Sequence, residues 1–198
     1  MNGKYKTREI TGRRSEGSLC GVDLAPGLKE QVDGSYRLES QADSFIEFPN
    51  NEGLDIKDST TILFCMHPQA TDGPIFRIKS SNPSSIHIRM ESGKLVAEFT
   101  GRNHQCTKLT TDQPLPLNQW HHVGSSYDQN TGMASLWLNG QQVEKKYIGD
   151  GMHVATQDNV RVGATGDGGP YFKGRITAME IYNVALRKKQ MNVIGKGS

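Results

Sequence analysis

Short apolar runs recur along almost the whole chain, and each is bounded by Gly, Pro, Asn or Asp. Runs of this length between turn residues are typical of β-strands, whereas helices show longer segments with a period of 3.6 residues. In several runs apolar and polar residues alternate, as in a strand with one buried face. Ile86, Ile88 and Met90 share one face, while His87 and Arg89 share the other. The pattern predicts an all-β protein.

About eleven strands are expected, and one of them, around Thr61–Met66, is apolar on both faces and should lie centrally. Asn139-Gly140 separates two strands and favours a type I′ hairpin turn, because both central residues of that turn need positive φ. Only Ala185–Ile194 has a helical pattern. The sequence therefore predicts a two-sheet antiparallel sandwich or jelly roll with one short C-terminal helix. The expected strands are Ser44–Phe48, Thr60–His67, Pro74–Lys79, Ile86–Met90, Leu95–Thr100, Gln105–Thr110, Trp120–Tyr127, Met133–Leu138, Gln141–Lys146, Asn159–Gly163 and Gly174–Tyr182.

Length and composition exclude several classes of protein. The chain has 198 residues, which suits one domain, and 34% of them are hydrophobic, which suffices for one core. No stretch approaches the roughly 18 apolar residues of a membrane-spanning helix, so we expect no membrane insertion. The formal net charge is only +2, which argues against a general nucleic-acid binder.

Three cysteines, Cys20, Cys65 and Cys106, are too few for a disulfide scaffold. No CxxC pair is present, which argues against a structural zinc site. Two interpretations of Cys65 stay open: it packs as a small hydrophobe, or it bonds to Cys106, which would require neighbouring strands.

A series of motifs occurs in a fixed order along the chain: Glu9–Gly12, Gly34–Glu39, Ser44–Pro49, Leu54–Ile56, Ser59–Phe64, Leu117–Val123 with Ser126–Asp128, Gly132–Gly140, and Phe172–Ile176 with Ile181–Leu186. Together they resemble the laminin-G-like, concanavalin A-like jelly roll. The resemblance covers roughly residues 9–190 and implies a single domain, residues 1–198, with its core at about 9–190. Lectins, glycan-binding modules, pentraxins, adhesion domains and some glycosidases share this scaffold, so the fold alone does not select a function.

An enzyme is not expected. Glycosidases of this fold carry paired carboxylates on one strand, as retaining hydrolysis requires, but the acidic residues here are scattered singly. His121 and His122 are adjacent on a strand, so they face opposite ways and cannot converge on one ligand. Trp120 and Trp137 lie in motifs that the resemblance assigns to the core.

The resemblance to pentraxins also raises the questions of a calcium site and of a disulfide. In the two loops where pentraxins hold calcium, this chain keeps only Asn82 and Asp167 as side-chain candidates, so we expect no cofactor or at most a weak calcium site. The position that pentraxins bridge to Cys65 is Gly124 here, so the pentraxin disulfide is not expected.

Basic residues concentrate between Gly73 and Thr110, where six Lys and Arg stand against two Glu. Several lie on the polar faces of strands that we expect to be neighbours, and such a face suits sulfated glycans or an acidic protein. Tyr171 follows a glycine-rich segment and is expected at the rim. The candidate ligand-binding residues are Arg77, Lys79, His87, Arg89, Arg102 and Tyr171.

The sequence thus predicts a non-catalytic recognition module. As the resemblance implies, it would be one domain of a larger extracellular or cell-surface protein and would bind a glycan or a glycosylated or matrix protein, with a sulfated polysaccharide as one option. Two alternatives stay open: a glycoside hydrolase or lyase on the same fold, and a structural spacer that binds nothing.

Overall fold

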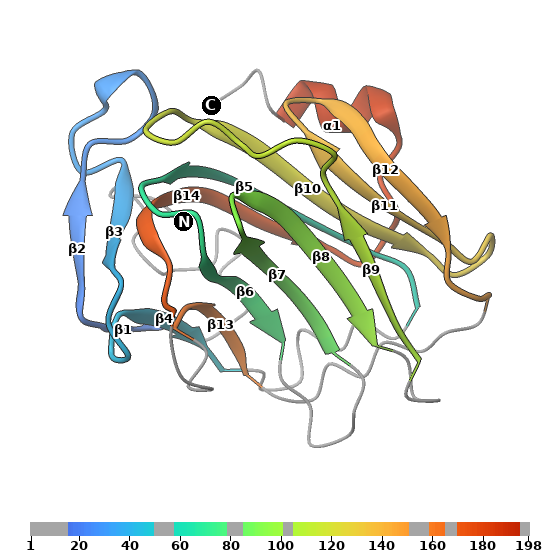
Figure 1. Cartoon of the computed structure of the whole chain (residues 1–198), viewed down its shortest axis with the longest axis horizontal. Helices are drawn as coiled ribbons and strands as arrows, with labels where there is room; N and C mark the ends of the chain where they lie inside the picture. The colour runs from blue at the N-terminus through green and yellow to red at the C-terminus, as the bar shows by residue number, and fades with distance from the viewer. Residues whose placement is uncertain are drawn as a thin grey trace.

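The computed structural model describes residues 16–49, 58–78, 85–100, 105–150, 159–164 and 170–194. These residues form fourteen strands, one 3₁₀ turn and one short helix (Figure 1). In chain order the elements are β1 (Ser18–Cys20), β2 (Val22–Ala25), η1 (Leu28–Glu30), β3 (Ser35–Glu39), β4 (Phe45–Phe48), β5 (Thr60–Pro68), β6 (Gly73–Ile78), β7 (Ser85–Glu91), β8 (Lys94–Thr100), β9 (Cys106–Thr110), β10 (His121–Asp128), β11 (Met133–Leu138), β12 (Gln141–Tyr147), β13 (Val160–Gly163), β14 (Lys173–Tyr182) and α1 (Lys188–Ile194).

The strands form two seven-stranded sheets that lie one behind the other in Figure 1. The front sheet has the order β1-β4-β13-β6-β7-β8-β9, and the back sheet has the order β12-β11-β10-β5-β14-β3-β2. Neighbouring strands pair antiparallel, for example β6 with β7 and β5 with β14. The predicted all-β antiparallel jelly roll with one short C-terminal helix is confirmed.

The core lies between the sheets and is built from the inward-facing half of each strand. Ile62, Phe64 and Met66 of the back sheet and Phe76 and Ile88 of the front sheet belong to one fully buried cluster. Strand β5 is buried along its whole length, as its apolar pattern predicted, because β10 and β14 flank it and the core covers its inner face.

The helix α1 explains the apolar outer face of β5. Leu186, just before α1, and Met191 in α1 pack against Leu63 and Trp137 on the outer surface of the back sheet. The helix begins at Lys188, three residues after the predicted start. Leu186 precedes it in extended chain, with its backbone N–H bonded to the hydroxyl of Thr61 at 2.9 Å.

Turn chemistry sets the register of these strands. Asn139 and Gly140 have φ of 50° and 78°, which confirms the predicted type I′ hairpin between β11 and β12. Gly73 begins β6 with φ of 136°, and a side chain there would meet the backbone of Phe172 at 2.3 Å. Only glycine fits at this position, where the backbone at the start of β6 passes close to the backbone just before β14.

Candidate functional site

A row of charged and polar side chains crosses the outer surface of the front sheet. Strand pairing places Arg161 opposite Arg77, Arg77 opposite His87, His87 opposite Glu98, and Glu98 opposite Lys108. We call these five residues the charged row. Adjacent strands are about 4.8 Å apart, so the row extends about 19 Å across β13, β6, β7, β8 and β9.

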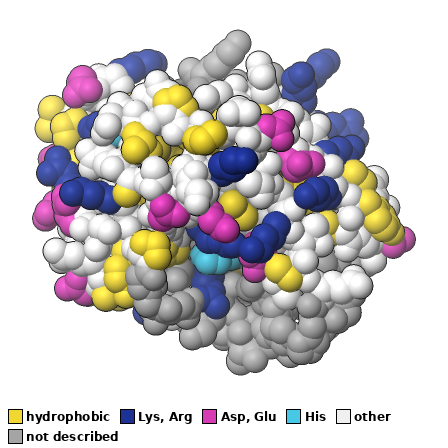
Figure 2. Space-filling view, viewed as in Figure 1, with side chains coloured by type: hydrophobic (Ala, Val, Ile, Leu, Met, Phe, Trp, Pro, Cys, Tyr) yellow, Lys and Arg dark blue, Asp and Glu magenta, His cyan; other side chains and the backbone are white. Residues whose placement is uncertain are grey.

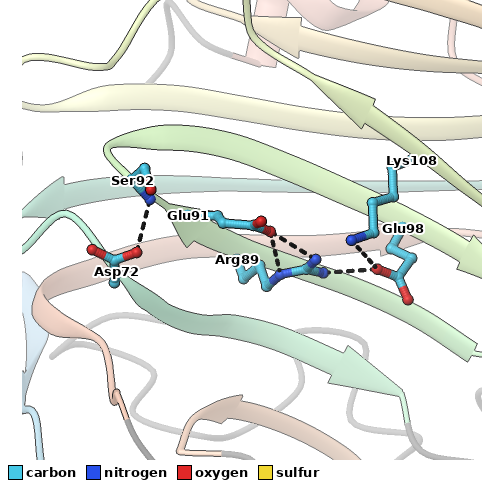
Figure 3. A network of polar contacts seen from close by, with 6 residues as sticks. All are labelled: Asp72, Arg89, Glu91, Ser92, Glu98 and Lys108. Atoms are coloured by element: carbon cyan, nitrogen blue, oxygen red, sulfur yellow. Dashed lines mark hydrogen bonds and ion pairs between the residues drawn. The ribbon is translucent and has the colours of Figure 1, made fainter.

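Carboxylates balance much of the positive charge on this surface (Figure 3). The guanidinium of Arg89 donates to Glu98 at 2.9 Å and to Glu91 at 2.9 and 3.2 Å. The ammonium of Lys108 lies 3.9 Å from the same Glu98 oxygen. Two basic residues of the segment seen in the sequence, Arg89 and Lys108, are therefore part of an ion-pair network.

A further ion pair, between Arg161 and Glu47, lies at the β13 end of the charged row. Arg161 donates from Nε to Glu47 at 2.8 Å, and its guanidinium lies 4.1 Å from the centre of the Phe45 ring. Phe45 and Glu47 lie two residues apart on β4, so their side chains are on the same outer surface of the sheet. This pair fixes the planar guanidinium at one end of the row.

His87 occupies the middle of the row. Burial, together with the positive charges of Arg89 and Arg77, lowers the pKa of His87 to about 4. The imidazole is therefore neutral at pH 7 and can donate or accept a hydrogen bond. Its Nε2 atom is buried and has no hydrogen-bond partner among the described residues. Figure 2 shows a histidine on this surface, flanked by Lys and Arg side chains.

Glu98 is unsuited to acid catalysis. Burial opposes its ionisation, but hydrogen bonds from Arg89 and Cys106 outweigh burial and hold the pKa of Glu98 below its usual value. Glycoside hydrolysis requires one carboxyl group that stays protonated at working pH. The carboxylate of Glu98 is instead ionised and already engaged.

The structure brings together three of the candidate ligand-binding residues: Arg77, His87 and Arg89 all lie on the outer surface of β6 and β7. Tyr171 is half-buried elsewhere, with its carbonyl accepting from the Ser40 hydroxyl at 2.8 Å. The remaining candidates, including the two calcium candidates, lie outside the described residues: Lys79, Asn82, Arg102 and Asp167.

Sequence reasoning missed Glu98, Lys108 and Arg161 as members of the row. Alternation along β8 and β9 places Glu98 and Lys108 on the polar face, so that signal was present in the sequence. Arg161 joins the row only because β13 inserts between β4 and β6, and that pairing links segments more than 80 residues apart in sequence. The local sequence pattern around Arg161 therefore does not predict this pairing.

The structure buries one of the two tryptophans and leaves the other partly exposed. Trp137 is 7% exposed, and its indole donates to the Ser126 hydroxyl at 3.2 Å. Trp120 precedes β10 and is only half-buried on the outer surface of the back sheet. It differs from Trp137 because α1 covers Trp137 and does not pack on Trp120. His121 and His122 face opposite ways, as predicted, and His121 is buried beside the Pro116 carbonyl.

All three cysteines are free. Cys65 is buried in β5 of the back sheet, whereas Cys106 is exposed on β9 of the front sheet, so the Cys65–Cys106 bond does not form. Burial, with the nearby charge of Glu180, raises the pKa of Cys65 to about 11. Cys65 therefore packs as a small hydrophobe and carries no thiolate at neutral pH.

In the part of the chain that the structure describes, no three His, Cys, Asp or Glu side chains lie close enough together to hold a metal ion. None of the helical segments there has the length and apolarity that crossing a membrane requires.

Three comparisons relate this chain to known proteins. A family model described as the concanavalin A-like lectin/glucanases superfamily, of laminin G type, matches residues 40–192. Pentraxin-related protein PTX3 of Mus musculus is 27% identical over 124 residues, which cover 58% of this chain and 32% of the relative. Serum amyloid P-component of Cavia porcellus is 29% identical over 82 residues, or 40% of this chain and 37% of the relative. The chain thus matches about a third of the length of these relatives.

Solved structures with the same fold are more distant in sequence. The binding domain of Paraclostridial Mosquitocidal Protein 1 superposes with a TM-score of 0.78 at 18% identity, covering 96% of this chain and 49% of that one. The ligand binding domain of botulinum neurotoxin serotype D, solved in complex with N-acetylneuraminic acid, superposes with a TM-score of 0.77 at 17% identity, covering 95% of this chain and 47% of that one.

Proposed function

Because the chain belongs to the concanavalin A-like lectin/glucanases superfamily, we propose that it is a non-catalytic recognition module whose charged row binds an acidic glycan. The proposed ligand is a sulfated or carboxylated polysaccharide, presented alone or on a glycosylated or matrix protein. The module would be one domain of a larger extracellular or cell-surface protein. No covalent chemistry is part of the proposal.

One observation carries this assignment: the buried Nε2 of His87, which has no partner among the described residues, lies in the middle of a row with cations toward both ends. Sugars present hydroxyl groups that donate and accept, and acidic sugars add negative charge. A neutral imidazole serves either hydroxyl role, while Arg77 and Lys108 on either side of it favour the negative groups. The row's length of about 19 Å suits a chain of several sugar units rather than one.

The relatives support the class of ligand and the location. A domain of the same fold has been crystallised with N-acetylneuraminic acid, an acidic sugar. One relative in sequence is named as a serum component, which supports an extracellular setting. Both observations concern those proteins. For this chain they indicate that acidic glycans are the ligands to test first.

The test is retention on immobilised heparin compared with neutral dextran. We expect retention on heparin that weakens steeply as salt rises, because counterions compete for the same charges. Arg77→Gln and Lys108→Gln should each elute at clearly lower salt than the wild type. Lys188→Gln, in α1 on the back sheet, removes the same charge and should change elution little. Equal losses from row and control variants would show nonspecific charge attraction and would overturn the proposal.

Turnover and array measurements separate the two alternatives from binding. A glycoside hydrolase or lyase would release fragments from a polysaccharide panel, and the activity would disappear when one carboxylate is removed. A structural spacer would bind nothing on an array that includes sulfated, carboxylated and neutral glycans. Binding without cleavage is the result that we expect.

A further inference from the structure

Two arginines lie side by side on the outer surface of the back sheet, opposite to the charged row. Strand pairing places Arg37 of β3 directly opposite Arg175 of β14. Like charges in this arrangement destabilise a sheet. Arg37 reaches Glu39 at 3.7 Å, and both of those side chains are well exposed. Among the described residues, Arg175 has no carboxylate within ion-pair distance. Arg37 also has Asp23 of β2 opposite it on its other side, so Arg175 is the member of the pair whose charge no carboxylate of the described residues balances.

Two contacts hold Arg175 in place. Its Nη1 donates to the Pro26 carbonyl at 2.8 Å, and its guanidinium lies 5.3 Å from the centre of the Trp120 ring. A guanidinium fixed by a backbone acceptor and an aromatic ring loses little further freedom when it binds an anion. The side chain is thus ordered before any ligand arrives.

His67 supports the same place from β5. Its ring meets Trp120 edge-on, with 5.4 Å between the ring centres. Burial and the nearby Arg175 lower the pKa of His67, so the imidazole is neutral at neutral pH. Its Nδ1 is buried without a hydrogen-bond partner among the described residues. Trp120 therefore has the His67 ring beside it and the Arg175 guanidinium above it, and its side chain remains partly exposed.

We propose that Arg37, Arg175, Trp120 and His67 form a second binding site, for the carboxylate of an acidic sugar. The carboxylate would lie between the two guanidiniums, which present donors in the planar arrangement that carboxylates accept. The pyranose ring would lie against the exposed part of Trp120, because a sugar has an apolar face that suits an indole. This site does not depend on the proposed function, since it lies on the other sheet.

The test is a titration of the protein with sodium glucuronate at constant ionic strength, followed by tryptophan fluorescence and calorimetry. Trp137 is buried, so a change in fluorescence reports Trp120, and Trp120→Phe should abolish it. Glucose should bind at least tenfold more weakly than glucuronate, because it lacks the carboxylate. Sodium sulfate at the same ionic strength is the control for an anion that is not a sugar. Affinity for sulfate equal to that for glucuronate would overturn the assignment to a sugar.

Substitutions assign the site to the back sheet. Arg175→Gln should weaken glucuronate binding at least tenfold. Arg37→Gln should weaken it several-fold, and because this side chain is exposed, the variant should fold normally. Lys188→Gln, in α1, removes the same charge outside both sites and should leave the affinity unchanged. If Lys108→Gln weakens binding and Arg37→Gln does not, glucuronate binds at the charged row, and the second site is rejected while the proposed function stands.

Discussion

The two outer surfaces of the sandwich use the same side chains in different ways. On the front sheet Arg89 and Arg161 donate to carboxylates on their own or neighbouring strands, at 2.8–3.2 Å. On the back sheet Arg175 donates to a backbone carbonyl and rests over an indole. An arginine is thus a structural ion-pair partner or an available cation depending on whether its own or a neighbouring strand supplies a carboxylate within reach.

The back sheet is itself divided. One half is covered by Leu186 and Met191, which bury Leu63 and Trp137. The other half leaves Trp120 partly open beside Arg175. One surface therefore serves packing at one end and, in our proposal, binding at the other. Trp137 lies in the covered half and Trp120 in the open half, so substitutions of these two residues compare the halves directly.

The largest effect is expected from removing the covered tryptophan. Trp137→Ala should lower the free energy of unfolding by about 3–5 kcal/mol, because it leaves a cavity beneath α1 and removes the indole bond to Ser126. Trp120→Ala should cost less, since its side chain is partly exposed and no helix covers it. Urea denaturation of both variants provides the measurement. Equal losses would show that the two halves of the back sheet do not differ.

The second effect concerns the front sheet and pH. The pKa of His87 is about 4 in the folded protein, whereas an unfolded histidine has a pKa near 6.5. Between these values the unfolded chain binds more protons, so stability falls as pH is lowered from about 6.5 to 4. The contribution of His87 to that loss is up to about 3 kcal/mol.

The variant His87→Gln isolates this contribution, because glutamine does not titrate. Unfolding free energies at pH 7 and pH 4 should differ less in the variant than in the wild type. The remaining histidines and carboxylates are common to both proteins and cancel in the comparison. Identical pH dependence would mean that His87 is more accessible to water than its pKa implies.

A smaller effect should follow from neutralising the centre of the ion-pair network. Glu98→Gln weakens the bonds to Arg89 and Lys108 and should cost about 1–2 kcal/mol, a modest value because the network is partly in solvent. The same change frees positive charge in the charged row. Retention on heparin should therefore increase while thermal stability decreases. If both decrease, the carboxylate itself contacts the ligand.

The sequence predicted the sheets far better than the surfaces. Alternation in Ile86–Met90 and the Asn139-Gly140 turn are local signals, and the strands and hairpin follow from them. Strands β1, β2 and β3 were missing from the expected strands. β1 and β2 have only three or four residues with mostly exposed side chains, so they show no apolar alternation. β3 has five residues, of which only Tyr36 and Leu38 are apolar. Sequence alone placed Arg77, His87 and Arg89 on one face, but the partners of their charges come from strand order.

Arg175 and Trp120 illustrate why the second surface was not predicted. They are 55 residues apart, on β14 and just before β10, and they meet across the intervening strand β5. Trp120 belongs to a motif that indicates the fold, and such motifs suggest a packing role. Only the position of α1, which covers one half of the back sheet, decides which tryptophan stays exposed.

The smallest effect is expected from removing calcium, and it tests whether either surface depends on a metal. Among the described residues, both surfaces are held by ion pairs, hydrogen bonds and packing, and the two calcium candidates of the sequence, Asn82 and Asp167, lie outside those residues. A bound ion stabilises a fold by RT ln(1 + [L]/Kd), so a weak site contributes little at millimolar calcium. Adding EDTA should shift the melting temperature by less than about 2 °C, which corresponds to less than about 1 kcal/mol for a domain of this size. A fall of many degrees would reveal a high-affinity site, and Asp167→Asn would then be the variant to compare, since it removes the charge of the remaining acidic candidate while keeping its size.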